Sequence, residues 1–323
     1  MKIQDAKVLI FGAGSIGERH INNLLKLGCP SIFVYRQRNL PLRNVQSANI
    51  QVITSWEEID EIKPDAAFIT SPTAQHLFQA KECVKRKIPV LVEKPLSHSS
   101  EGLNELKQLV QTHQSFVQVG YMMRYHPLIQ KIKEMIAHQP LGKLVYFRSY
   151  WGEHLPYWHP WEDYRTSYAA RKELGGGAAL TLSHDIDLAN WLSNSSLLSY
   201  HTIHNFNSTL EVDVESAADI NLKYKNGLSA HVHLNFFQKI PRREYQFEFE
   251  QASVYFDFFK SELQIVSEQG TEVIKADHFD RNDLFIAQTQ AFFEQLDKPG
   301  SVAHSIRQIE ESELIITICQ HGN

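Results

Sequence analysis

The sequence lacks several features that would each place the protein in a distinct class. It has only three cysteines among 323 residues, widely spaced at positions 29, 83 and 319. So few thiols exclude a disulfide-stapled scaffold and favour a reducing compartment. No apolar run approaches the roughly 20 residues that a transmembrane helix needs, and no signal-peptide core precedes the first apolar run. We therefore expect a cytoplasmic protein with no membrane partner.

An excess of basic charge is also missing. The net charge is −5, and lysine and arginine form no tract. Nucleic-acid binding needs a concentrated basic surface, so we predict no nucleic-acid partner. Histidine and cysteine do not occur at the spacing of metal ligands, and His154 and His159, for example, lie five residues apart. We therefore predict no metal site.

The strongest motif that is present follows the first apolar run. Residues 7–11 predict a strand, residues 18–27 predict a helix, and the turn between them carries the pattern G-x-G-x-x-G. This order is typical of a dinucleotide-binding site. Gly12 permits the tight turn, Gly14 lets the backbone approach a pyrophosphate, and Gly17 lets helix and strand pack closely. The pyrophosphate would lie at the helix N-terminus, where free N–H groups favour an anion.

The rest of the chain predicts two domains. Up to about residue 120, short apolar runs alternate with helical segments, which predicts parallel strands joined by right-handed crossovers. A helix is predicted after Gly177 as far as about Leu192, and residues 197–274 alternate between apolar and polar, as in an antiparallel sheet with one polar face. We predict an α/β fold, with a doubly wound dinucleotide-binding domain over residues 1–120 and an α+β domain with an open, largely antiparallel sheet over residues 121–323.

The residue after the second predicted strand bears on which dinucleotide binds. A site for NAD usually has an acidic residue there, about 20 residues past the glycines, to hold the ribose 2′-hydroxyl. Here Arg36 occupies the place, with Arg38 two residues on. An arginine can pair with a 2′-phosphate through its planar fork of donors. We predict NADP in preference to NAD; the alternative is that Arg36 stacks on the adenine or lies solvated and selects nothing.

Two later stretches carry residues suited to chemistry. Lys94 follows the fifth predicted strand, and ligands of an open α/β sheet bind beyond the carboxyl ends of its strands. His184 and Asp187 lie three residues apart, so they share one face of a helix. An aspartate so placed can orient a histidine that takes or gives a proton. Taken singly, Lys94 would be a surface charge and His184 an interior histidine.

Together, these motifs resemble the glucose–fructose oxidoreductase / inositol dehydrogenase (Gfo/Idh/MocA) family. The resemblance implies a Rossmann domain followed by an α+β domain whose sheet forms a homodimer or homotetramer. It also implies NAD(P)-dependent hydride transfer on a sugar, polyol or nucleotide-sugar substrate. The motifs that carry it run through the chain in order: the glycine turn, Ser71-Pro72-Thr73 with His76, Glu93-Lys94-Pro95, residues 120–127, and Gly175-Gly176-Gly177 with His184-x-x-Asp187.

The resemblance also implies roles for single residues. Lys94 would bind the reacting oxygen, His184 would exchange its proton, and Asp187 would hold His184 or contact a substrate hydroxyl. The expected cofactor residues are Gly12, Gly14, Ser15, Ile16, Gly17, Arg36, Arg38, Ser71, Pro72, His76, Glu93 and Lys94.

The substrate side leaves alternatives open. Many family members have an aspartate shortly before the catalytic histidine, whereas Thr181 stands there and supplies no charge. This difference leaves room for a non-catalytic dinucleotide-binding sensor, or for a redox-assisted hydrolase that retains its cofactor. The aromatic stretch 151–165 is either a wall that covers a sugar or a packed connecting loop. The candidate substrate residues are Tyr121, Arg124, Trp158, His159, Tyr164, Arg165 and Thr181.

Overall fold

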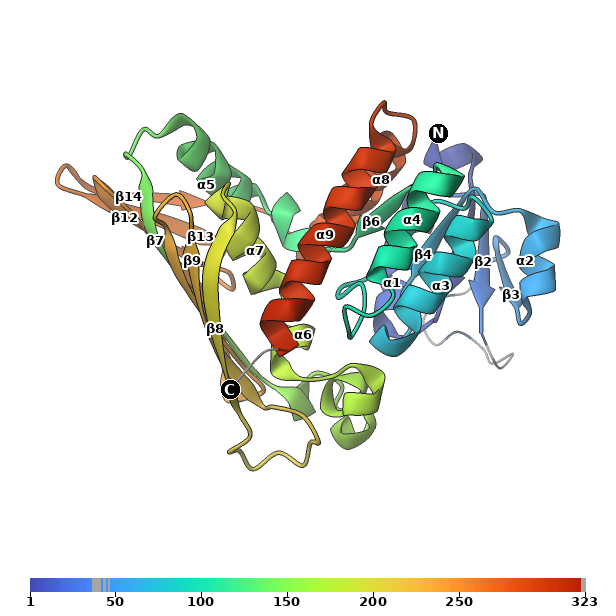
Figure 1. Ribbon diagram of the computed structural model, residues 1–323, viewed down its shortest axis with the longest axis horizontal. Coiled ribbons are helices and arrows are strands. Elements are labelled where there is room, and N and C mark those ends of the chain that lie inside the picture. The colour runs from blue at the N-terminus through green and yellow to red at the C-terminus, as the bar shows by residue number, and fades with distance from the viewer. Residues whose placement is uncertain (37–41, 43–44, 46, 321–323) are drawn as a thin grey trace. The chain divides into compact units, whose positions relative to one another are not determined.

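The computed structural model describes residues 1–36, 42, 45 and 47–320. The chain divides into two compact units, both visible in Figure 1. The first unit comprises Met1–Gly120 and Phe285–Leu314, and the second comprises Tyr121–Leu284 and the chain from Ile315 onward.

These units differ in one segment from the predicted domains 1–120 and 121–323. Residues 285–314 return to the first unit because their apolar side chains complete its core. Phe292, on helix α8 (Arg281–Leu296), places its ring 5.5 Å from that of Phe68 and 5.6 Å from that of Phe116. The second compact unit is therefore not one continuous stretch of sequence.

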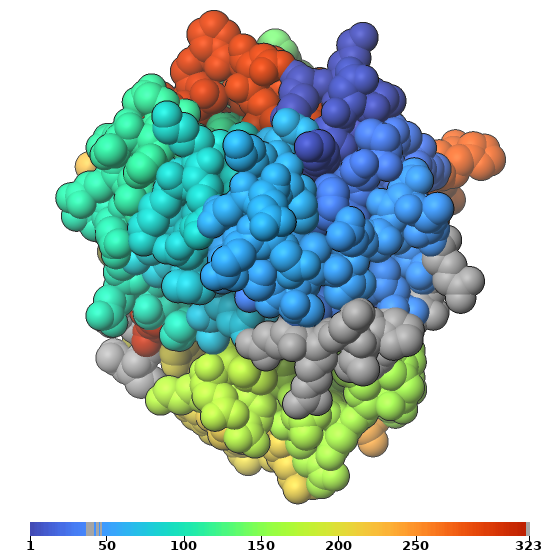
Figure 2. All heavy atoms as spheres, turned by 90° about the vertical axis from the view of Figure 1, so that its right-hand side faces the viewer, coloured from blue at the N-terminus to red at the C-terminus, as the bar shows by residue number. Residues whose placement is uncertain are grey.

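The first unit is built on a parallel sheet of six strands in the order β3-β2-β1-β4-β5-β6, which confirms the doubly wound prediction. The order reverses between β1 and β4, and ligands of such sheets bind at this reversal. Figure 2 shows the outer face that α2 and α3 (blue to cyan) present. The strands are β1 (Lys7–Phe11), β2 (Ser31–Tyr35), β3 (Ile50–Ile53), β4 (Ala66–Ile69), β5 (Val90–Val92) and β6 (Val117–Val119), and the helices are α1 (Ser15–Lys26), α2 (Trp56–Ile62), α3 (Thr73–Lys85), α4 (Leu103–His113), α8 and α9 (Ser301–Gln320), the last of which continues into the second unit.

Two helix starts show how well local signals work. α2 begins after Ser55, because the Ser55 hydroxyl accepts from the Glu58 N–H and the Glu58 carboxylate accepts from the Ser55 N–H. α4, by contrast, has no serine at its start. That helix begins after Gly102, whose φ of 78° lies in the left-handed region that glycine adopts at little cost.

The second unit contains an eight-stranded sheet in the order β14-β13-β12-β11-β7-β10-β9-β8. Neighbouring strands run antiparallel except β7 and β10, which confirms the predicted largely antiparallel sheet. The strands are β7 (Leu144–His154), β8 (Leu197–Asn205), β9 (Ala217–Tyr224), β10 (Ser229–Asn235), β11 (Phe237–Phe249), β12 (Ala252–Asp257), β13 (Glu262–Ser267) and β14 (Gly270–Lys275), and the helices are α5 (Pro127–His138), α6 (Ala178–Thr181) and α7 (His184–Ser193).

The helix predicted after Gly177 is in fact two helices, α6 and α7. Leu182 and Ser183 stand between them, and the Ser183 side chain makes no cap hydrogen bond to α7. Asp185 and Asp187 then lie in the first turn of α7, where the helix dipole favours negative charge. The break makes His184 the first residue of α7.

His126 is a buried titratable residue at the start of α5. Its Nδ1 accepts a hydrogen bond from the Leu128 N–H at 3.2 Å. Its ring lies 4.4 Å from that of Phe279 and 4.9 Å from that of Phe256. Burial, assisted by the positive charge of Arg243, lowers the pKa of His126 to about 3. The folded protein therefore holds this histidine neutral.

We expect the protein to lose stability as the pH falls below about 6.5, the pKa of an unperturbed histidine. Between this pH and the folded pKa of about 3, His126 is protonated in the unfolded chain but stays neutral in the folded protein. Stability is therefore full above the upper value and decreases with falling pH, by up to about 1.4 kcal/mol per pH unit from this residue. His126→Asn keeps a cap acceptor without titrating. Urea unfolding of both proteins from pH 7 to 4.5 measures the effect, and parallel pH dependences would contradict it.

Candidate functional site

The glycine turn after β1 is closed on one side and open on the other. Gly12 has φ of 86°, and a Cβ there would lie 3.0 Å from the backbone of Ser71, after β4. A Cβ on Gly17 would lie 2.3 Å from the Gly12 carbonyl oxygen. At Gly14, the N-cap of α1, an added Cβ would have no atom of another described residue within 4 Å, its chain neighbours and its own helix backbone aside. This arrangement fits a dinucleotide, because open backbone and a helix N-terminus stand where a pyrophosphate would approach.

The ends of β1 and β2 carry the residues expected to meet the adenosine end of a dinucleotide. Arg36 directly follows β2, and Arg38 lies outside the described residues. Sequence reasoning missed an aromatic cluster here. The Phe11 ring lies 5.2 Å from that of Tyr35 and 5.3 Å from that of Trp56. The sequence did indicate this cluster, because Phe11 and Tyr35 are the last residues of two neighbouring strands.

The loop Glu93-Lys94-Pro95 is contacted by two buried histidines. His20 of α1 places Nε2 2.8 Å from a carboxylate oxygen of Glu93. His76 of α3 places Nδ1 2.8 Å from the Pro95 carbonyl oxygen and Nε2 2.7 Å from the Ser71 carbonyl oxygen. His20 was missed from the sequence, although it lies one helical turn after Gly17. The loop is thus attached to the helices that follow β1 and β4.

Charge and burial compete in this loop. Burial raises the pKa of Glu93, but the hydrogen bond and charge of His20, with the charge of Lys94, outweigh it and hold the pKa below its usual value. Both ring nitrogens of His76 face carbonyl oxygens, which only the protonated ring could satisfy in full. Burial nevertheless dominates and lowers the pKa of His76. Glu93 is therefore charged and His76 neutral at neutral pH.

In the second unit, His184 lies in an aromatic surround. Only 3% of the residue is exposed, and its ring lies 6.0 Å edge-on from Tyr121 and 6.3 Å from Trp151. Asp187 is paired with Arg124, whose Nε and Nη2 donate to the two carboxylate oxygens at 3.0 and 2.6 Å. The structure thus brings together four of the predicted residues: Tyr121, Arg124, His184 and Asp187.

A buried ionic network that sequence reasoning missed stands beside His184. Asp185 is fully buried and accepts from the Ser149 and Tyr245 hydroxyls, each at 2.8 Å, and from Arg243 Nη2 at 2.5 Å. The Arg243 guanidinium lies 3.8 Å from the centre of the Trp151 ring. The network holds the start of α7 and the Trp151 ring, which packs beside His184. The sequence held one indication of this network: Arg243 lies two residues before Tyr245 on β11, so both side chains face the interior.

The other candidate substrate residues have separate environments within the second unit. Thr181 is buried in α6. The ring of Trp158 packs against that of Phe236 at 5.5 Å. The exposed Arg165 pairs with Asp163 and Glu211. His159 lies beside Trp161, and the Tyr164 hydroxyl accepts from the Glu211 N–H.

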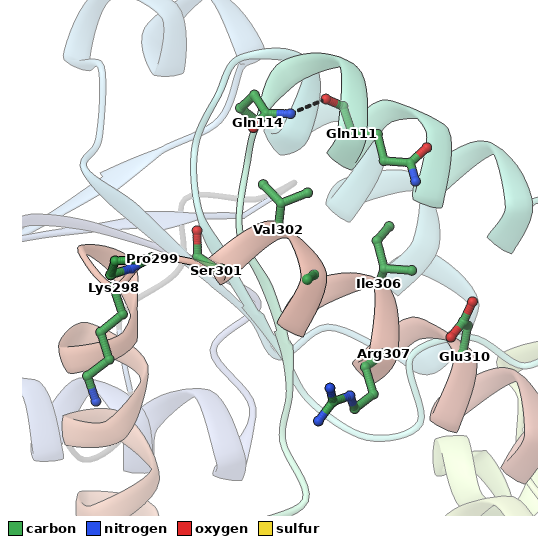
Figure 3. Close-up of a pocket in the computed structure, with 11 residues that line it drawn as sticks. Gln111, Gln114, Lys298, Pro299, Ser301, Val302, Ile306, Arg307 and Glu310 are labelled. Atoms are coloured by element: carbon green, nitrogen blue, oxygen red, sulfur yellow. Dashed lines mark hydrogen bonds between the residues drawn. The ribbon is translucent and has the colours of Figure 1, made fainter.

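A surface pocket of about 790 Å³ lies elsewhere on the first unit, as Figure 3 shows. The end of α4, the turn 298–300 and the start of α9 line it, and none of the predicted cofactor residues does. The glycine turn therefore remains the candidate cofactor site. In the described ranges, no three His, Cys, Asp or Glu side chains are grouped as a metal would require. No helix in that part of the chain is long and apolar enough to cross a membrane.

Two protein-family profiles match the chain. One, described as an oxidoreductase family with an NAD-binding Rossmann fold, matches residues 6–121. The other, described as the GFO/IDH/MocA C-terminal domain, matches residues 129–255. Among curated proteins, the uncharacterized oxidoreductase YrbE of Bacillus subtilis is 28% identical over 68% of this chain and 64% of its own length. Inositol 2-dehydrogenase of Rubrobacter xylanophilus is 28% identical over 56% of this chain and 50% of its own. The matches thus span half to two-thirds of these relatives.

Solved structures share the fold over nearly the whole chain. Levoglucosan dehydrogenase in complex with NADH superposes with a TM-score of 0.81 at 16% identity, over 97% of this chain and 96% of that one. UDP-N-acetylglucosamine 3-dehydrogenase of Acidithiobacillus ferrooxidans superposes with a TM-score of 0.77 at 16% identity, over 98% and 96%. At such identities the likeness shows the fold alone.

Proposed function

Because the chain belongs to the Gfo/Idh/MocA family of oxidoreductases with an NAD-binding Rossmann fold, we propose that it transfers a hydride between a nicotinamide cofactor and a carbinol or carbonyl carbon of a sugar, polyol or nucleotide sugar. The observation that carries the proposal is the glycine turn, closed at Gly12 and Gly17 and open at Gly14. Lys94 follows β5 at the carboxyl edge of the same parallel sheet, where ligands of this fold bind.

Each role in the proposed reaction follows from side-chain chemistry. The nicotinamide, when bound, supplies the hydride acceptor or donor. The Lys94 ammonium polarises the substrate oxygen and stabilises the negative charge that develops on it. His184 takes the proton from the alcohol, or returns it in the reverse direction. Asp187, held by Arg124 through both oxygens, orients the first turn of α7, which begins at His184.

The proposal is tested by cofactor titration followed by turnover. NADH and NADPH are titrated by fluorescence, and the preferred cofactor is then assayed with myo-inositol, scyllo-inositol, levoglucosan and UDP-N-acetylglucosamine, substrates that appear in the names of relatives and structural neighbours. We expect redox turnover with at least one of them. Tight cofactor binding with no redox change across the panel would favour a sensor. Cofactor that stays bound through purification, with product formed and no net redox change, would favour a redox-assisted hydrolase.

Gly14→Ala should weaken dinucleotide binding about tenfold or more, which corresponds to about 1.4 kcal/mol, without changing the melting temperature. Alanine tolerates the φ of −76° at this position, and among the described residues nothing beyond the local backbone lies within 4 Å of the new methyl group. The methyl group would instead occupy the space proposed for the pyrophosphate. Gly17→Ala is the contrasting variant, because its Cβ would lie 2.3 Å from the Gly12 oxygen and lower stability as well. Wild-type affinity in Gly14→Ala would refute the placement.

The finer proposal, NADP in preference to NAD, depends on Arg36. Arg36→Ala should weaken NADPH binding about 10- to 100-fold, because hydrogen bonds to charged groups contribute about 1.5–3 kcal/mol. NADH affinity should stay within about threefold. Parallel fluorescence titrations of the two cofactors measure the ratio, and a wild-type protein that prefers NADH would overturn this choice.

We also propose that the sheet of the second unit mediates a homodimer or homotetramer. On β12, Val254 and Phe256 are buried, so Tyr255 between them faces the opposite side of the sheet and is 40% exposed. Val273, paired through Gln264 with Tyr255, is 50% exposed on the same side. Exposed apolar side chains on one sheet face favour association. Sedimentation velocity measures the oligomeric state, and a monomer at micromolar concentration would contradict the proposal.

A cytoplasmic location is the remaining part of the proposal. The three cysteines are buried and free, as expected where thiols stay reduced. Immunoblotting of cytoplasmic and membrane fractions tests it.

A further inference from the structure

The loop that carries Lys94 is held at both of its ends by histidines from two different helices. On one side, His20 of α1 donates to the Glu93 carboxylate at 2.8 Å. On the other side, His76 of α3 lies between two carbonyl oxygens, with Nδ1 2.8 Å from that of Pro95 and Nε2 2.7 Å from that of Ser71, and the neutral ring donates to one of them. Lys94 is the one residue between these two anchor points. Its backbone position is therefore fixed relative to the helices that follow the glycine turn and Ser71-Pro72.

The anchor on the Glu93 side is tightly packed. His20 has no exposed surface, and its ring lies edge-on against Phe68 at 5.2 Å and Phe285 at 5.7 Å. The Glu93 N–H donates to the Ile69 carbonyl at 2.9 Å, which keeps the loop in register with β4. A Cβ on Gly120 would lie 3.3 Å from the Glu93 carboxylate, so the neighbouring chain closes over the side chain. A carboxylate this buried is costly without its donor, which makes the pairing with His20 specific.

We propose that His20 and His76 are positioning residues that set the location of the Lys94 ammonium relative to the glycine turn. This inference rests on the proposed role of Lys94 in binding the reacting oxygen. It also assigns Glu93 and His76 to holding this loop, in addition to the cofactor contacts expected from the sequence. A misplacement of about 1 Å in a reacting group can cost about 100-fold in rate. A tether of contacts that fix the residues on both sides of Lys94 should therefore raise the rate of the reaction.

Hydrogen–deuterium exchange of the full chain tests the tether without a substrate. The double variant His20→Leu/Glu93→Leu replaces both partners by apolar side chains, which preserves stability better than removing one. We expect amides in peptides covering residues 93–97 to exchange about tenfold faster or more, while those of β1 stay protected. His20→Gln keeps an amide donor toward Glu93 and should exchange like the wild type. Unchanged exchange in the double variant would overturn the proposal.

Kinetics then test whether the tether acts through Lys94. With the most active substrate of the panel, the double variant should lose about 10- to 100-fold in kcat, with KM within about threefold of the wild type. The single variant His20→Gln should keep most of the wild-type kcat. If the double variant has both the kcat and the melting temperature of the wild type, the pair has a merely structural role and the proposal is wrong. If the double variant does not fold, His76→Leu gives the same two measurements from the other end of the loop.

The two proposals fail in different ways. If Lys94→Ala turns over like the wild type, the proposed role of Lys94 is wrong, yet the exchange measurement still decides whether the histidines hold the loop. If Lys94→Ala is inactive and the tether variants neither exchange faster nor slow turnover, only the positioning role is wrong.

Discussion

Lys94→Ala should lower kcat/KM by about 100- to 1,000-fold and should lower dinucleotide affinity much less, because Lys94 is only one of the twelve expected cofactor residues. A preorganised donor at the site where negative charge develops contributes this much to catalysis when it is removed by mutation. The dinucleotide pyrophosphate is proposed to bind at the glycine turn, which the substitution leaves intact. Steady-state kinetics with the most active panel substrate and a fluorescence titration of the cofactor, run on the same preparation, measure the two quantities.

Matched variants separate this effect from a general loss of positive charge. Lys85→Ala removes an exposed lysine of α3 that pairs with Glu82, and it should leave both quantities unchanged. Lys94→Arg keeps the charge but replaces a compact ammonium by a planar fork, so it should recover only part of the activity. His184→Ala tests the proton step in the same assay, with an expected loss of about 100- to 10,000-fold. Wild-type turnover in Lys94→Ala or in His184→Ala would refute the corresponding role.

Much of the first unit could be predicted from the sequence because its signals are local. The strand Lys7–Phe11 and the glycine turn that follows it are each encoded by neighbouring residues, through an apolar run and a backbone requirement. The separate environments of Gly12, Gly14 and Gly17 also match what the motif requires.

The pairings that support the site could not be predicted in the same way. His20 and Glu93 lie 73 residues apart, and Asp185 and Arg243 lie 58 apart. Periodicity indicates that a residue faces inward, but it does not indicate its partner. An inward Arg243 beside an outward Arg242 therefore had the appearance of a surface pair. For the same reason, the apolar face of α8 predicted burial but not its return to the first unit.

Arg243→Met should destabilise the protein by about 3–5 kcal/mol, the usual cost of removing one partner of a buried ion pair. Arg243 is 1% exposed and Asp185 is fully buried. Without the guanidinium, Asp185 would keep only the Ser149 and Tyr245 hydroxyls as donors, which do not neutralise its charge. Urea unfolding at neutral pH, followed by tryptophan fluorescence, measures the loss.

The double variant Arg243→Met/Asp185→Asn shows whether the loss of stability arises from the unpaired charge of Asp185. Asparagine keeps an oxygen that can accept from both hydroxyls but carries no charge, so most of the loss should be recovered, with a coupling of about 1.5 kcal/mol or more. Arg242→Met is the matched control, because the adjacent arginine is 55% exposed in its ion pair with Glu244 and should cost less than about 1 kcal/mol. Additive losses in the double variant would mean that Arg243 stabilises the sheet through its packing on Trp151 and not through Asp185.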